Sequence, residues 1–191
     1  MVGNLPNFNN IDVLMCLLEI EKPVSRSYLS KELEIGEGTI RSILDILKEN
    51  KLLISTNAGH QLSEKGKTML RNIKKHFAIK KIKKLDFFPS KKIVGVQIKK
   101  SVLGKKAFVL RDEAVKNGAE GALILIFNGK LKFYDSKYQQ DLKDIENEFR
   151  LGKHDLVILA YSDSYKGAKH GAISAALCVD KSLKSILENF C

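Results

Sequence analysis

The 191-residue sequence has no tryptophan, three prolines and three cysteines. Cys16, Cys178 and Cys191 are odd in number and far apart, so they predict neither a disulfide framework nor a zinc knuckle. The longest unbroken apolar runs have six residues, whereas a membrane helix needs about 20. The first residues have neither the basic nor the apolar region of a signal peptide. These absences predict a soluble, cytoplasmic protein with no membrane association.

The sequence is otherwise ordinary for a globular protein. Hydrophobic residues make up 44% and charged residues 29% of the chain. That content of apolar side chains is enough to build a core, which excludes a largely disordered chain. The length suits one or two domains, each of roughly 100–200 residues.

Acidic residues are scarce in one long segment. Between Lys65 and Lys106 there are fifteen Lys and Arg residues and a single acid, Asp86. The formal net charge of the chain is +11, so this segment carries the whole excess. A concentrated positive field attracts polyanions, and nucleic acid is the common candidate. The alternative is a lysine-rich helix and linker that simply face water.

The periodicity of apolar residues predicts different elements in the two halves. Helices are expected over residues 10–21, 25–34 and 37–50, then a hairpin of residues 52–55 and 60–62, then a helix after Ser63. After residue 87 the pattern shifts to strands, with a hairpin signal at Asn128-Gly129. The prediction is a two-domain chain of the α+β or α/β class. Residues 1–86 form a helical domain and residues 87–191 a mixed-sheet α/β domain whose strand order is left open.

Four runs in the first half match a known layout. They are Tyr28-Leu29-Ser30-Lys31-Glu32-Leu33, the run from Ile35 to Arg41, the run from Leu44 to Leu53, and Gly59-His60-Gln61-Leu62-Ser63-Glu64-Lys65-Gly66. In this order and spacing they resemble the winged helix-turn-helix regulators of archaea and bacteria. The resemblance implies that the third helix enters the major groove of double-stranded DNA and that the chain regulates transcription.

The resemblance also implies which residues contact DNA. Thr39, Arg41 and Ser42 would face the bases, and Arg41 is the best candidate because a guanidinium can bond guanine O6 and N7 together. Lys48 would lie nearer the backbone, and Gly38 would let the start of the helix approach closely. The remaining candidates would meet phosphates or lie at the hairpin: Ser25, Arg26, Tyr28, Asn57, His60, Gln61, Lys65 and Lys67.

Other interpretations of the same helices stay open. Winged helices also serve as protein–protein modules, and Glu37 and Asp45 on the third helix would not favour phosphates. Arg41 could pair with Asp45 at i, i+4 instead of contacting DNA. RNA is less favoured, because aromatic stacking platforms are few. A homodimer is expected, since regulators usually bind DNA with a pair of DNA-binding domains.

A second candidate site follows the last predicted strand. The segment from Ser162 to Gly171 is expected to be a loop that opens a helix, which is where α/β domains bind small ligands. Backbone N–H groups at a helix start favour an anion. The predicted ligand residues are Ser162, Asp163, Lys166, Gly167, Lys169 and His170. The alternative is a simple turn in which Gly167, Gly171 and Ala175 form a close-packing face.

The signals for catalysis are weak. The four histidines are scattered, so neither a metal site nor a cofactor is predicted. The whole chain also resembles uncharacterised archaeal proteins that join a winged helix to an α/β domain. The runs from Arg111 to Val115, Gly118 to Ala122 and Asp155 to Ile158 carry that likeness. It implies a regulator whose second domain senses a small anionic effector or dimerises. The alternative is an enzyme acting on a small anionic metabolite, with the winged helix as a docking module.

Overall fold

The computed structural model describes residues 8–83, 85, 88–101, 104–180 and 184–185. These residues divide into two compact units, one up to residue 73 together with Ser185 and one from 74 to 184, called unit 1 and unit 2 below. The sequence predicted the division at residues 86 and 87, which lie outside the described residues. The observed division comes thirteen residues before residue 86, for a reason given by the sheet.

Unit 1 begins with three helices, α1 (Asn10–Glu19), α2 (Arg26–Leu33) and α3 (Glu37–Glu49). Local capping fixes where the first two start. Asn9 caps α1, and the Asp12 carboxylate accepts the Asn9 N–H at 2.9 Å in return. The Ser25 hydroxyl caps α2 by accepting the Tyr28 N–H at 3.1 Å. These three helices agree with the sequence prediction to within two residues at each end.

A hairpin and a long helix follow. Strands β1 (Leu53–Thr56) and β2 (Gly59–Leu62) pair antiparallel, and α4 covers Glu64–His76. Ser63 starts α4, because its hydroxyl accepts the Gly66 N–H at 3.0 Å. The core of unit 1 comes from all three early helices and the residue before β1, chiefly Leu14, Leu17, Leu29, Leu33, Ile40, Ile43, Leu44, Leu47 and Leu52.

Unit 2 is built on one five-stranded sheet in the order β3-β4-β7-β5-β6. Its strands are β3 (Phe77–Ile82), β4 (Lys92–Ile98), β5 (Gly121–Phe127), β6 (Leu131–Phe133) and β7 (Asp155–Ser162). The two-domain, mixed helix-and-strand class is confirmed. The pairings between the described strands are all antiparallel, however, so the sheet itself is not mixed. The sequence could not show this, because the partner of each strand is distant in the chain.

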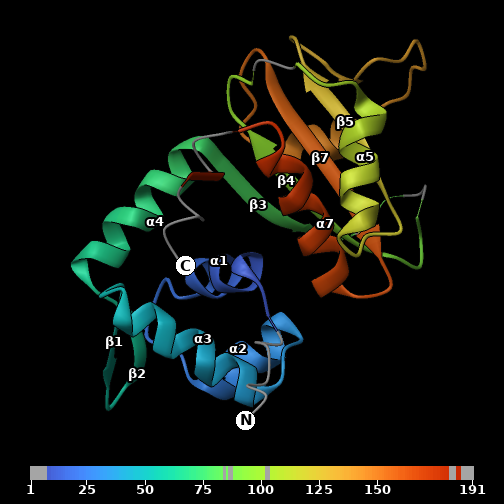
Figure 1. The fold of residues 1–191 in the computed structure, drawn as a ribbon. Coiled ribbons are helices and arrows are strands. Elements are labelled where there is room, and N and C mark those ends of the chain that lie inside the picture. The colour runs from blue at the N-terminus through green and yellow to red at the C-terminus, as the bar shows by residue number, and fades with distance from the viewer. Residues whose placement is uncertain (1–7, 84, 86–87, 102–103, 181–183, 186–191) are drawn as a thin grey trace. The chain divides into compact units, whose positions relative to one another are not determined.

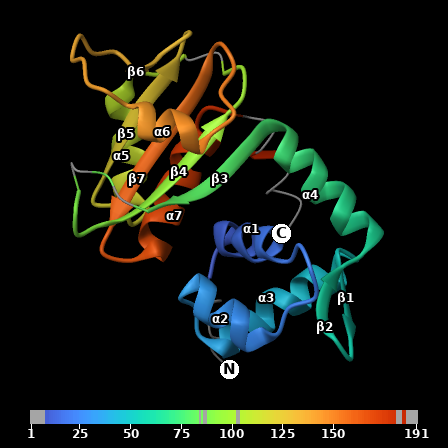
Figure 2. The same cartoon turned by 180° about the vertical axis from the view of Figure 1, so that it is seen from behind.

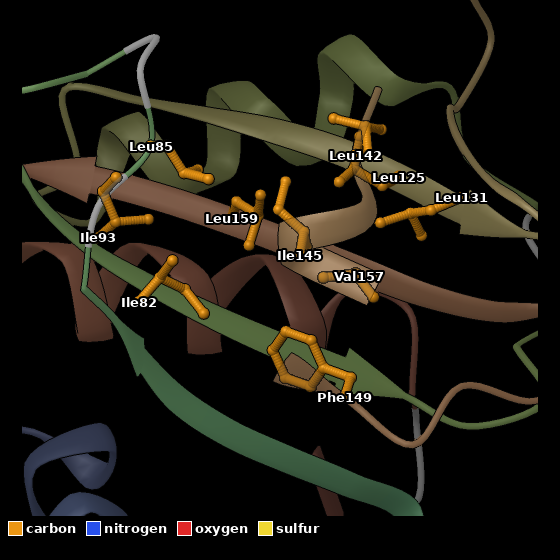
Figure 3. Close-up of a cluster of buried hydrophobic side chains, with 10 residues drawn as sticks. All are labelled: Ile82, Leu85, Ile93, Leu125, Leu131, Leu142, Ile145, Phe149, Val157 and Leu159. Atoms are coloured by element: carbon orange, nitrogen blue, oxygen red, sulfur yellow. The ribbon is translucent and has the colours of Figure 1, made fainter. Parts of the chain in front are cut away.

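Helices cover both faces of the sheet. Helices α5 (Ala107–Lys116) and α7 (Tyr165–Leu177) lie on one face (Figure 1), and α6 (Lys143–Glu148) lies across the other (Figure 2). Alternate residues of each strand therefore face different layers. On the α6 side the side chains converge on one cluster (Figure 3), made of Ile82, Leu85, Ile93, Leu125, Leu131, Leu142, Ile145, Phe149, Val157 and Leu159.

Strand β3 explains the early division between the units. It follows α4 without a break and pairs with β4 along its whole length, from Phe77 opposite Ile98 to Ile82 opposite Ile93. The sequence predicted a helix after Ser63 and no strand between that helix and residue 87, with a lysine-rich helix and linker as one interpretation of the basic segment. Lys80 and Lys81 are exposed on an edge strand, where lysine is common because it discourages pairing with another chain.

Candidate functional site

Helix α3 presents a polar face to solvent. Its buried stripe consists of Ile40, Ile43, Leu44 and Leu47. Arg41, Ser42, Asp45 and Lys48 are exposed and are called the exposed α3 face below, while Thr39 is half-buried at its margin. The sequence assigned these positions correctly, because a helix with one apolar stripe leaves the opposite side to polar residues.

Ion pairs engage two of the three acids of α3, Glu37 and Asp45. The Arg26 Nη2 atom lies 3.1 Å from Glu37 Oε2, and the Lys48 Nζ atom lies 3.2 Å from Asp45 Oδ1. Asp45 therefore pairs with Lys48 rather than with Arg41, which was the alternative that the sequence left open. Within the described part of the chain, Arg41 has no ion pair. Its guanidinium is the donor of the exposed α3 face that a ligand could bind without first breaking a salt bridge.

The start of α2 lies exposed beside this arrangement. Ser25 is exposed, and its hydroxyl is already used to cap the helix and to contact Ser27 at 3.1 Å. Tyr28 is 47% exposed although it is a large aromatic residue. Gly38 lies in the first turn of α3, and a Cβ added there would meet no atom within 4 Å.

The hairpin is fixed to the residue that precedes α2. Val24 and His60 exchange two backbone hydrogen bonds, of 2.9 and 2.8 Å, and form a β-bridge. Gly59 has φ +120°, and a Cβ there would lie 2.6 Å from the Val24 oxygen, so only glycine fits. This contact holds the hairpin tip, with Asn57 exposed and Gln61 half-buried, in a set position relative to α2.

The environment of His60 shows that cations gather here. Partial burial is the main cause that lowers the pKa of His60, and the charges of Lys48 and Arg26 lower it further. Asp45 opposes them. The hairpin, the start of α2 and the end of α3 are thus close enough to share one electrostatic field. His60 Nδ1 also lies 2.9 Å from the Ser55 hydroxyl.

Two lysines after the hairpin already have partners. The Lys65 Nζ donates to the Asn50 carbonyl at 3.0 Å, and the Lys67 Nζ lies 2.7 Å from Glu64 Oε1. Both side chains are exposed. The candidate residues of unit 1 therefore differ. Arg41 has no ion pair with any residue that the structure describes, whereas Arg26, Lys48, Lys65 and Lys67 each have a partner.

The second candidate site differs from its prediction in local structure. The predicted loop ends at Ser164, whose hydroxyl caps α7 by accepting the Gly167 N–H at 3.0 Å. Lys166, Gly167, Lys169 and His170 therefore belong to the first two turns of the helix. The glycine at 167 and the lysines around it concealed the helix start, because glycine usually marks a turn.

Packing occupies much of α7. A Cβ at Gly167 would lie 2.5 Å from the Gly118 oxygen, and one at Gly171 would lie 2.5 Å from the Ala119 Cβ. Ser162 is buried and donates its hydroxyl to the Gly118 oxygen at 3.3 Å. Lys169 is only 4% exposed. The close-packing alternative describes these two glycines, and the binding of an anion here stays a prediction.

Asp163 takes part in a cluster that the sequence did not reveal. The Lys91 Nζ lies 2.7 Å from Asp163 Oδ1 and 2.5 Å from Glu120 Oε2. These hydrogen bonds raise the pKa of Lys91, and the bond from Lys91 lowers the pKa of Asp163. The three residues come from three separate segments, so no spacing in the sequence could predict their contact.

The described residues offer neither a metal-binding cluster nor a membrane-spanning helix. They contain no group of three or more His, Cys, Asp or Glu residues placed to hold a metal ion. No helix among them is both long and apolar enough to span a bilayer.

Comparisons with known proteins support the division into two parts. Residues 10–68 match the PH0730-like N-terminal domain, and residues 90–181 match a domain of unknown function (DUF4443). No curated protein matches the sequence. The crystal structure of HmgR from Pseudomonas aeruginosa aligns with 94% of this chain and 96% of its own at 10% identity, and its TM-score of 0.30 is too low to indicate a shared fold. Hypothetical protein PH0730 from Pyrococcus horikoshii OT3 is 24% identical, with a TM-score of 0.81 over 96% of this chain and 100% of its own, and this chain has the same fold.

Proposed function

We propose that unit 1 is a winged helix-turn-helix that binds double-stranded DNA, and that the protein is a cytoplasmic transcriptional regulator. The observation that carries the proposal is Arg41, which lies on the exposed α3 face and has no ion pair among the described residues. An exposed guanidinium on a helix with a buried opposite stripe can enter a major groove and bond a guanine edge.

The neighbouring cations fit the same proposal. Arg26 and Lys48 lie close enough to His60 for their charges to lower its pKa. A phosphate backbone alongside would replace the carboxylates of Glu37 and Asp45 as their partners. Exchange of exposed ion pairs costs little, because such a pair contributes about 0–1 kcal/mol. The hairpin, held by Val24, would contact the backbone or minor groove beside the helix.

Selection from random duplexes tests the proposal. The full-length protein, at low salt, should enrich one sequence motif, and its affinity should fall with salt by a log–log slope of about −0.9 for each phosphate contacted. Recovery of no motif, with binding that is equal for all duplexes, would reject sequence-specific regulation and leave only charge-driven contact.

A homodimer and a small anionic effector belong to the proposal for unit 2. If two DNA-binding domains act as a pair, the selected motif should contain two half-sites about one helical turn apart. Light scattering of the purified protein reports the mass in solution. A metabolite screen by thermal shift tests for an effector, and turnover of a bound compound would favour the enzyme alternative instead.

A further inference from the structure

Unit 2 contains a cavity that neither the predicted sites nor the proposed function uses. It has a volume of about 530 Å³, within the range of small-molecule sites. It lies against the edge strand β6 and the segment that follows, and is lined by Lys130, Leu131, Lys132, Phe133, Ser136, Lys137, Tyr138, Gln139 and Gln140.

The lining combines an aromatic surface with positive charge. The rings of Phe133 and Tyr138 meet edge to face, with centroids 5.3 Å apart. Tyr138 remains 62% exposed, so one face of its ring is open for stacking. Its orientation is set locally, because its N–H donates to the Ser136 hydroxyl and its own hydroxyl donates to Gln140 Oε1, both at 3.1 Å.

The charge in this cavity is uncompensated. Three lysines line it, at positions 130, 132 and 137, and no acid does. Among the described residues none of these lysines has an ion pair. The nearby Asp141 pairs with Lys143, and the Glu146 carboxylate accepts the Leu131 N–H at 2.5 Å. An anion would therefore find ammonium groups with no carboxylate to displace.

We propose that this cavity binds a nucleotide, with the base stacked on Tyr138 and the phosphate held by Lys130, Lys132 or Lys137. A flat ring joined to an anion matches the two kinds of surface, and stacking on an aromatic residue suits any base. Gln139 and Gln140 add amide donors and acceptors at the rim. The proposal does not depend on DNA binding by unit 1. The bound nucleotide could be a free mononucleotide or one nucleotide of a single strand.

Titration of the full-length protein with AMP, and separately with a ten-nucleotide deoxyadenosine strand, tests the proposal. Tyr138→Ala should weaken binding about five- to a hundredfold, because one stacked base is lost. Tyr138→Phe keeps the ring and should bind within about twofold of the native protein. Lys132→Gln should weaken binding by a smaller factor. Phe108→Ala and Lys153→Gln remove an exposed ring and an exposed charge elsewhere in unit 2, and should change nothing.

Amide chemical shifts locate the ligand. Changes confined to residues 130–140 on addition of AMP support the proposal with a free nucleotide as the ligand. The same changes with the strand alone support it with a nucleic acid as the source. Absence of binding to both, equal loss in Tyr138→Ala and Tyr138→Phe, or shifts elsewhere would overturn it. Arg41→Ala should leave this binding intact, so that failure here and failure of the proposed DNA contact remain distinguishable.

Discussion

Helices α3 and α7 both have 13 residues, but they differ in how many of those residues are buried. Helix α3 buries four residues along one stripe and leaves the charged residues outside. Helix α7 buries eight, including two that are polar, and its glycines fit against the segment from Ala114 to Ala119. Both were candidate binding elements in the sequence. The difference shows that polar residues at a helix start become available for binding only where packing does not use the rest of the helix.

Replacing one glycine by alanine in each helix should give the largest difference in the free energy of unfolding. Gly171→Ala would place a Cβ 2.5 Å from the Ala119 Cβ and 2.8 Å from the Ala114 oxygen, so we expect a loss of about 3 kcal/mol in the free energy of unfolding. Gly38→Ala meets open space and should be neutral or stabilise by up to about 1 kcal/mol. Urea denaturation of the two variants measures both.

Equal stability of the two glycine variants would contradict the packing of α7 described here. The same Gly38→Ala protein has a second use. If the start of α3 approaches DNA closely, its affinity for the selected duplex should fall although its stability does not.

Truncation of the exposed Arg41 guanidinium should give the next largest effect. Arg41→Ala is expected to weaken binding to the selected duplex by about 1–3 kcal/mol and to relax the choice of one base pair. Its free energy of unfolding should stay within about 0.5 kcal/mol of the native value, because Arg41 is exposed and has no ion pair within the described ranges. Arg111→Ala, which removes an exposed arginine of unit 2, is the matched control and should bind as the native protein does. A loss of equal size in both variants would point to overall charge rather than to a contact by α3.

The sequence predicted most of unit 1, because its signals are local. Ser25 and Ser63 cap helices three residues away, and the apolar stripe of α3 has helical spacing. It predicted less of unit 2, where the deciding contacts are distant. Strand β3 looked like linker because Lys80 and Lys81 interrupt its apolar pattern, and only pairing with β4 shows it to be a strand. Lys91 meets Asp163 across 72 positions. The cavity beside Tyr138 is lined by residues 130–133 and by residues 136–140, whose path no periodicity encodes.

Protonation of His60 offers a pH test of the shared field. The folded pKa lies below its ordinary value of about 6.5, so the stability that neutral His60 contributes is complete above about pH 6.5 and is lost as the pH falls. Bound DNA should favour the protonated form of His60 instead, because its phosphates stabilise the imidazolium. Duplex affinity is therefore expected to rise a few-fold between about pH 7.5 and about pH 5.5. His60→Asn should remove that rise. If the rise persists unchanged in the variant, another group is responsible.

Removal of one acid from the exposed α3 face should have the smallest effect on stability. Asp45→Asn breaks the exposed pair with Lys48, which is worth about 0.5 kcal/mol or less. The same change removes a negative charge that opposes phosphate and frees an ammonium group, so duplex affinity should increase while thermal stability hardly moves. The steepness of the salt dependence should also increase by about one phosphate contact. Asp112→Asn in unit 2, whose carboxylate pairs with Arg111 at 2.8 Å, is the control for net charge. Because both variants change the charge of the chain equally, tighter binding by Asp45→Asn alone would assign the effect to α3, and equal tightening by both would assign it to the protein as a whole.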